Sequence, residues 1–215
     1  VTKLSETTAM IGFAGAPWTV ATYMIEGGTS KDYQKTRRYA YESKDDFQAL
    51  IDILVDATAA HLIRQLDEGA EVIQVFDSWA GVLPPEQFDQ WVIKPFQKIV
   101  LTVKEAYPEV PIIGFPRGAG LGYSTFAERT GVDAVSLDST VPLDWAVENV
   151  QTHTVVQGNL DNLVLRAGGE LMEFTVKSIL DAFSNGPFIF NLGHGILPDT
   201  PVEHVEHLLK LVRES

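Results

Sequence analysis

Residues 46–77 have the sequence DFQALIDILVDATAAHLIRQLDEGAEVIQVFD, a long amphipathic run followed by a short apolar one. In the first part, Asp46–Glu68, apolar residues recur every three or four positions between an acidic start and Gly69, which predicts a helix. The second part, Glu71–Asp77, is almost continuously apolar, as is typical of a strand that is covered on both faces. A helix that leads directly into a buried strand indicates an α/β protein with parallel strands.

The same alternation continues toward both ends of the chain. Five more apolar runs are predicted to be strands: Thr8–Ala14, Pro111–Phe115, Ala134–Leu137, Thr154–Gly158 and Phe188–Leu192. Four more amphipathic runs are predicted to be helices: Pro85–Tyr107, Pro142–Val150, Gly169–Phe183 and Pro201–Glu214. Residues 15–41 show neither pattern clearly, and we expect a long, elaborated loop there over one face of the sheet. We find no linker, low-complexity tract or internal repeat, so residues 1–215 are expected to form a single domain.

Parallel strands joined by right-handed helical crossovers build either an open, doubly wound sheet or a (β/α)8 barrel. Six strands are too few to close an eight-stranded barrel. We therefore expect either an open sheet or the C-terminal portion of a longer barrel. The chain begins with Val rather than Met, which hints that its N-terminus is not the native one.

The composition excludes several classes of function. With 16 Lys and Arg against 29 Asp and Glu, the 215-residue chain has a formal net charge of −13, the reverse of a bare nucleic-acid binder. The absence of cysteine excludes disulfides, thiolate zinc sites and cysteine nucleophiles, and it is consistent with a reducing compartment. The longest apolar stretches, such as residues 8–20, are broken by Gly and Pro and are too short to span a bilayer.

Candidate functional residues gather where the predicted strands end, which is the functional edge in both architectures. His194 lies between two glycines after the last strand, where a ligand contact or proton transfer explains it better than a buried histidine bonded to backbone. Asp77 and Ser78 follow the second strand and can orient a substrate or cap the next helical region. No G-x-S-x-G elbow surrounds Ser78, so a hydrolytic nucleophile is not expected. Arg117 is the one Lys or Arg that we place at a strand end, where it binds an anionic ligand or pairs with a surface acid.

Two weaker patterns are expected to be structural. Gly118, Gly120 and Gly122 follow a strand, but their spacing is neither the dinucleotide fingerprint nor a Walker loop, so we expect a flexible turn beside a pocket. His204 and His207 lie three residues apart without an acidic ligand set nearby, so we expect a solvated helix face rather than a metal site.

Five segments at the strand ends form a recognisable set in chain order. They are GFAGAPWT at 12–19, YMIEG at 23–27, FDSWAG at 76–81, QGNLD at 157–161 and FNLGHG at 190–195, followed by Pro198 and residues 201–204. This set resembles the signature of the uroporphyrinogen decarboxylase family and covers nearly the whole chain. The resemblance implies a (β/α)8 barrel, of which this chain is roughly the C-terminal two-thirds, an incomplete barrel without its first strands.

The resemblance also implies an activity and its residues. It implies a carboxy-lyase of haem and tetrapyrrole biosynthesis, which converts uroporphyrinogen III to coproporphyrinogen III by releasing four acetate carboxylates as CO2. It also implies that the enzyme is a homodimer and lies in the cytoplasm. It implies neither a metal nor an organic cofactor, because the protonated pyrrole ring serves as the electron sink. By the same resemblance, Tyr23, Ser78 and His194 contact the substrate, and proton donation by His194 stays open. Asp77 and Arg117 are expected to support these contacts.

Two family features do not occur in this chain: the arginine-rich R-Q-A-G-R-Y type segment, which Arg37-Arg38-Tyr39 matches only out of order, and the aspartate that faces the pyrrole nitrogens. The substrate that the resemblance implies carries eight carboxylates. A chain with a net charge of −13 and one Arg at its strand ends has too little positive charge to bind them well. Three alternatives therefore stay open. They are a non-catalytic tetrapyrrole-binding fragment, a corrinoid-dependent methyltransferase relative that needs zinc ligands, and an open-sheet nucleotide binder that needs a phosphate loop.

Overall fold

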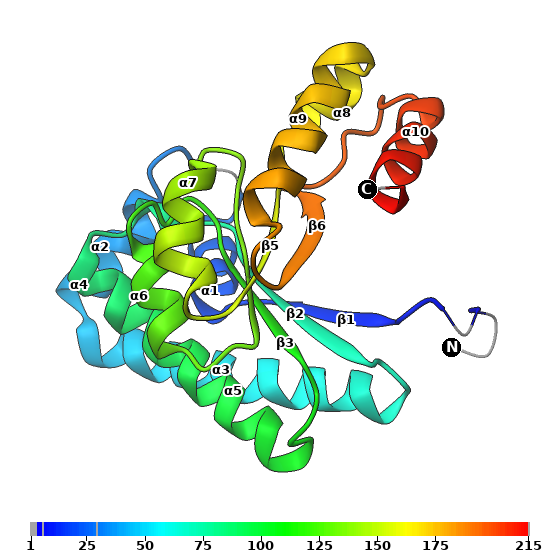
Figure 1. Cartoon of the computed structure of the whole chain (residues 1–215). Helices are drawn as coiled ribbons and strands as arrows, with labels where there is room; N and C mark the ends of the chain where they lie inside the picture. Colours follow the sequence, from blue (N-terminus) through cyan, green and yellow to red (C-terminus); the bar gives the residue numbers. More distant parts are fainter. Residues whose placement is uncertain (1–3, 6, 29, 215) are drawn as a thin grey trace. The chain divides into compact units, whose positions relative to one another are not determined.

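Strands and helices alternate along the described chain, and the strands pair in parallel, as the sequence predicts (Figure 1). The computed structural model describes residues 4–5, 7–28 and 30–214. Two compact units make up the chain, residues 1–133 and 134–215. That these residues form a single domain stays a prediction. None of the described helices is long and apolar enough to cross a membrane.

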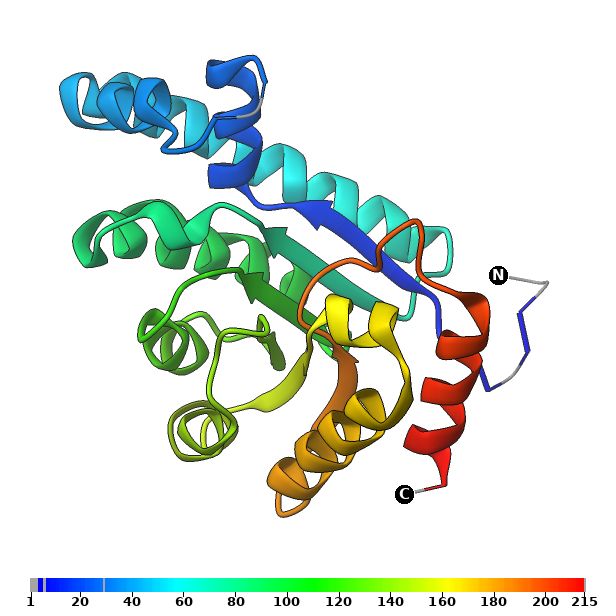
Figure 2. The same cartoon turned by 90° about the horizontal axis from the view of Figure 1, so that it is seen from above.

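The first unit is a three-stranded parallel sheet with helices packed along it. Its elements are β1 (Ile11–Gly15), α1 (Pro17–Glu26), α2 (Gln34–Glu42), α3 (Lys44–Asp67), β2 (Val72–Asp77), the 3-10 turn η1 (Ala80–Val82), α4 (Pro85–Phe88), the π-helix η2 (Asp89–Ile93), α5 (Lys94–Ala106), β3 (Ile112–Pro116) and α6 (Gly122–Arg129). Figure 2 shows β1, β2 and β3 side by side, in the order in which they pair. In the register, Gly15 lies beside Phe76 and Asp77 beside Pro116, which brings three strand ends to one edge.

The prediction of a long loop at residues 15–41 is wrong, because this stretch forms the helices α1 and α2. α1 begins with Pro17 in its first turn and ends at Gly27, whose φ of 71° is the left-handed conformation that favours glycine. α2 buries only Thr36 and Ala40, so it has no apolar stripe by which a sequence pattern could reveal it.

β1 and β6 are not covered on both faces, contrary to the prediction from their apolar runs. In β1, Gly12 and Ala14 are buried, whereas Ile11 and Phe13 are 46% and 63% exposed; in β6 no residue is fully buried. Within its own unit, each of these strands pairs on one side, β1 with β2 and β6 with β5. The other edge of β1 is bonded by Gln65 of α3, which accepts from the Phe13 N–H at 2.8 Å and donates to its carbonyl at 2.9 Å. The Gln65 side chain therefore occupies the backbone N–H and C=O of Phe13, which on an open edge would be free to pair with another strand.

The predicted helix Pro85–Tyr107 is one helical run with a wider turn inside it, made of α4, η2 and α5. Pro95 has no amide hydrogen to donate within the helix, and just before it the Lys94 N–H bonds the carbonyl of Asp89, five residues back. The helix α5 packs against α3, and both run along the sheet of the first unit (Figure 1).

The second unit contains three further parallel strands, β4, β5 and β6. Its elements are β4 (Ala134–Ser136), α7 (Leu143–Ala146), the π-helix η3 (Val147–Gln151), β5 (Val155–Leu160), α8 (Asn162–Ala167), α9 (Gly169–Phe183), β6 (Phe188–Leu192) and α10 (Val202–Arg213). The predicted bounds of α9 and β6 agree with the structure residue for residue. The helix α9 packs on β5 and against α10.

Candidate active site at the strand ends

Asp77, the last residue of β2, is a buried acid beneath the strand ends of the first unit. Its side chain is 1% exposed. The Thr19 hydroxyl donates to Asp77 Oδ1 at 2.6 Å, and the Thr19 backbone N–H also bonds the carboxylate. Burial raises the pKa of the Asp77 carboxyl from 3.8 to about 7, although the two hydrogen bonds from Thr19 lower it. The group therefore exchanges its proton near neutral pH.

The bonds from Thr19 reflect how α1 begins. The residue before the helix, Ala16, has no side-chain oxygen, so the first-turn amides of α1 need an acceptor from elsewhere. Asp77 supplies that acceptor from β2, at a sequence separation of 58 residues. The positive end of the helix dipole also favours a carboxylate at this place.

The loop that follows β2 is tied to α1 by two more hydrogen bonds. The Trp79 backbone N–H donates to the Thr19 hydroxyl oxygen at 3.3 Å, and Trp18 Nε1 donates to the Trp79 carbonyl at 3.0 Å. Trp18 is itself fully buried, with its ring 5.9 Å from that of Phe47 in α3. The first turn of α1 therefore fixes residues on both sides of Ser78.

The ends of β2 and β3 are also tied to each other. The Arg117 N–H donates to the Asp77 carbonyl, and the Gly81 N–H donates to the Arg117 carbonyl, both at 3.1 Å. The backbones approach so closely that a Cβ on Gly81 would lie 2.5 Å from the carbonyl oxygen of Gly118. Gly118 has a φ of 76°, so glycine is required on both sides of this contact.

Ser78 and Tyr23 present hydroxyl groups beside this tied loop. Ser78 is half-buried, and within the described part of the chain its hydroxyl makes no hydrogen bond. Tyr23 is 51% exposed, and its ring lies 6.1 Å from that of Trp79 in an edge-on arrangement. Both hydroxyls are therefore available to a ligand.

Arg117 and Tyr33 add charge and a further aromatic ring. Among the described residues, no carboxylate forms an ion pair with Arg117, so the alternative of a surface partner is not supported. The Tyr33 ring lies 5.0 Å from that of Trp79 and is 6% exposed. Burial raises the pKa of Tyr33 and nearby Tyr23 adds to the rise, while the positive charge of Arg117 opposes it. Tyr33 therefore connects the Trp79 ring, next to Ser78 in the chain, with the positive charge of Arg117.

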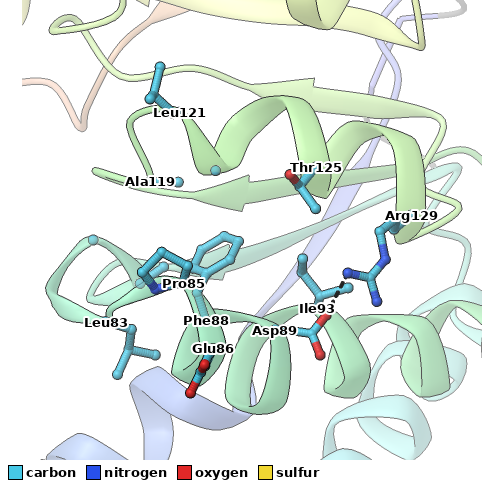
Figure 3. Close-up of a pocket in the computed structure, with 13 residues that line it drawn as sticks. Leu83, Pro85, Glu86, Phe88, Asp89, Ile93, Ala119, Leu121, Thr125 and Arg129 are labelled. Carbon is cyan, nitrogen blue, oxygen red and sulfur yellow. Dashed lines mark ion pairs between the residues drawn. The ribbon is translucent and has the colours of Figure 1, made fainter.

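A cavity of about 690 Å³ lies next to the loop ends, between α4 and η2 on one side and α6 on the other (Figure 3). Its walls are largely apolar, with Leu83, Phe88 and Leu121 among them. Its guanidinium group, on Arg129, is neutralised by Asp89 at 2.6 Å. Gly122, from the glycine turn that was expected beside a pocket, lines this cavity, but none of the five predicted site residues does, and its paired charges suit a polyanion poorly. The strand ends are the better candidate site.

In the second unit, His194 follows β6 on an exposed turn, so the alternative of a buried histidine is wrong. Gly193, directly before it, is buried, and its N–H donates to the Leu160 carbonyl at 2.7 Å. A Cβ on Gly193 would meet Ser139 N and would lie 2.9 Å from the carbonyl carbon of Asp138. Glycine thus lets the end of β6 pack on its neighbours while His194 itself is exposed.

Asn159 fixes the surface on which Gly193 packs. It is 5% exposed, and its Nδ2 donates to the carbonyls of Asp138 at 3.1 Å and Val141 at 3.0 Å. The Asp138 carboxylate in turn accepts from the Thr140 N–H at 2.9 Å. The turn after β4 is therefore held by buried side chains.

Comparison with known proteins identifies the family. The profile of uroporphyrinogen decarboxylase (URO-D) matches residues 1–215. A uroporphyrinogen decarboxylase from Rhodospirillum rubrum is 56% identical over 210 residues, which are 98% of this chain and 60% of that protein. The chain belongs to the uroporphyrinogen decarboxylase family. A second family member, from Chelativorans sp., is 52% identical and aligns over 99% of this chain and 62% of its own length. The chain thus spans about 60% of the length of the curated relatives that it matches.

A solved structure supports the fold that the family implies. A methyltransferase from Methanosarcina mazei superposes with a TM-score of 0.81, over 99% of this chain and 60% of that one, at 20% sequence identity. At this identity the likeness shows the fold alone. The chain therefore has an α/β fold of the (β/α)8 barrel family, as predicted.

The structure brings four of the five predicted site residues of this decarboxylase-family chain to the strand ends of the first unit: Tyr23, Asp77, Ser78 and Arg117. His194 belongs to the second unit. Sequence reasoning missed Thr19, Trp79 and Tyr33. Thr19 and Trp79 lie within the segments that resemble the family signature, and this resemblance could have indicated them as site residues. No sequence pattern predicts the contact between Tyr33 and Trp79.

Two histidines of this family member have structural roles in the second unit. His204 Nδ1 lies 3.1 Å from the carbonyl of Leu165, and His207 pairs with Glu173 at 3.3 Å. Both are half-buried, so the expected solvated face is only partly present. Across the residues that the structure describes, no three His, Asp or Glu side chains are grouped to hold a metal ion.

Proposed function

We propose that the protein carrying this chain is a uroporphyrinogen decarboxylase, which converts uroporphyrinogen III to coproporphyrinogen III. The observation that carries the proposal is the identity of 52–56%, over nearly all of the chain, to proteins of that name. The available hydroxyl and guanidinium groups of Tyr23, Ser78 and Arg117 support it, because a substrate with many carboxylates needs such donors.

The reaction demands little covalent chemistry from the protein. A proton added to a ring carbon makes the pyrrole cationic; the bond to the acetate carboxylate then breaks, its electron pair neutralises the ring, and CO2 leaves. A second proton on the remaining methylene and loss of the ring proton restore the pyrrole with a methyl group. The protein must therefore bind carboxylates, hold the ring and stabilise the cation.

Each proposed site residue has a task in this scheme. The Ser78 hydroxyl and the Arg117 guanidinium bind carboxylate groups of the substrate, and Tyr23 donates a hydrogen bond to it. Asp77 holds the loop on which Ser78 lies. The resemblance of residues 190–195 to the family signature supports a substrate contact by His194. The same resemblance supports a homodimer in the cytoplasm, acting on a small-molecule tetrapyrrole without nucleic acid.

Anaerobic incubation of the full gene product with uroporphyrinogen III tests the proposal. We expect stepwise loss of four carboxylates as CO2, measured by chromatography of the oxidised porphyrins. Ser78→Ala should raise KM about tenfold, the cost of a hydrogen bond to a charged group, with little change in Tm. Ser178→Ala on α9, another half-buried serine, whose hydroxyl bonds the Phe174 carbonyl, is the matched control.

The outcomes separate the candidate functions. Absence of turnover in the full gene product contradicts the decarboxylase proposal. Tight tetrapyrrole binding without CO2 release favours instead the non-catalytic binding role. Equal KM values for Ser78→Ala and the wild type would remove Ser78 from the substrate site.

A further inference from the structure

Thr19 connects α1 to the β2 loop through a single hydroxyl group. It is 4% exposed and lies in the first turn of α1. Its Oγ1 donates to Asp77 Oδ1 at 2.6 Å and accepts from the Trp79 N–H at 3.3 Å. One oxygen therefore serves as donor to the residue before Ser78 and as acceptor from the residue after it.

Loss of that hydroxyl would affect its two partners differently. Asp77 would keep the hydrogen bond from the Thr19 backbone N–H, whereas the Trp79 N–H would lose its acceptor. Trp18 holds the same loop through the Trp79 carbonyl, but that carbonyl belongs to the peptide between residues 79 and 80, whereas Thr19 bonds the N–H of the peptide between Ser78 and Trp79. Thr19 Oγ1 thus contacts the residues on both sides of Ser78.

We propose that Thr19 is a positioning residue of the substrate site, whose hydroxyl sets the orientation of Ser78 by bridging Asp77 and the Trp79 amide. The proposal rests on the proposed function, since it assigns Ser78 to carboxylate binding. Thr19 does not touch the substrate in this account. It acts through Ser78, so its removal should weaken substrate binding only while Ser78 is present.

The test compares Thr19→Val, which keeps the shape and removes the hydroxyl, with Thr19→Ser, which keeps the hydroxyl. In the full gene product, Thr19→Val should raise KM about tenfold and Thr19→Ser should stay within about threefold of wild type. Thr22→Val is the matched control, because Thr22 is 1% exposed in the same helix and its hydroxyl bonds the Thr19 carbonyl at 2.6 Å rather than the loop. It should lower Tm without changing KM.

A double variant decides whether Thr19 acts through Ser78. In a Ser78→Ala background, Thr19→Val should change KM by less than about twofold, because the hydroxyl that it positions is gone. An undiminished effect there would overturn the proposal, as would a Thr19→Ser protein as impaired as Thr19→Val. If Thr19→Val does not fold, Thr19→Cys replaces it and should be intermediate, since a thiol is a weak donor.

Hydrogen exchange keeps this inference separate from the proposed function. Whether or not the gene product turns over uroporphyrinogen, Thr19→Val should speed exchange of the Trp79 amide at least about tenfold, and Thr22→Val should not. Unchanged protection of that amide in Thr19→Val would overturn the positioning role. Increased exchange together with an unchanged KM would overturn it as well.

Discussion

Gly193→Ala is expected to destabilise the protein by about 3 kcal/mol or more, a fall in Tm of roughly 6–12 °C for a chain of this size. The added methyl group would meet Ser139 N and lie within 2.9 Å of the Asp138 carbonyl carbon and 3.0 Å of the Asn159 carbonyl oxygen. All three atoms are backbone, so no side-chain rotation can relieve the overlap. Thermal unfolding monitored by circular dichroism measures the change.

The glycine on the other side of His194 is the matched control. Gly195 is exposed and has nothing within 4 Å of an added Cβ, so Gly195→Ala should leave stability within about 0.5 kcal/mol. A tolerated Gly193→Ala, or two variants of equal stability, would contradict the close packing of the β6 end described here.

Asp77→Asn is expected to gain stability relative to wild type as the pH rises from 4 to 8, by roughly 3–4 kcal/mol. The folded pKa of Asp77 is raised from 3.8 to about 7, so folding favours the protonated acid. That contribution is fully present below pH 3.8 and is lost as the pH rises through 7. Asparagine keeps an acceptor for Thr19 and carries no charge, so it does not lose this contribution.

The measurement is urea unfolding of both proteins at several pH values. Asp56→Asn, on the exposed face of α3, controls for the change in formal charge and should differ from wild type by a constant amount. Parallel stability curves for Asp77→Asn and wild type across this pH range would show that Asp77 is not the buried acid described here.

Much of the fold could be predicted because its signals are local. The six strands are apolar runs between helices, and the sequence pattern finds them all with bounds that differ by at most a few residues. The exposed faces of β1 and β6 could not be predicted, because coverage of a strand depends on its neighbours. The failure at α2 has a different cause, since a mostly polar helix carries no periodic signal.

Only part of the candidate site could be predicted, namely the residues that lie at the ends of strands. Parallel strands end at one edge, so Asp77, Ser78 and Arg117 could be grouped by the topology alone. Thr19 and Tyr33 could not be, because their importance lies in contacts with residues far away in sequence. The bond from Trp79 to Thr19 spans 60 residues, and the packing of Tyr33 on Trp79 follows from the path of α2.

The most direct test of the central claim is hydrogen exchange of the full gene product with and without coproporphyrin III, the stable oxidised form of the proposed product. We expect protection of residues 77–82 and 116–121 and of the segment around Tyr23, with no change in α9. Protection confined to α4 and η2, at the cavity in Figure 3, or no protection in the first unit, would contradict a substrate site at the strand ends.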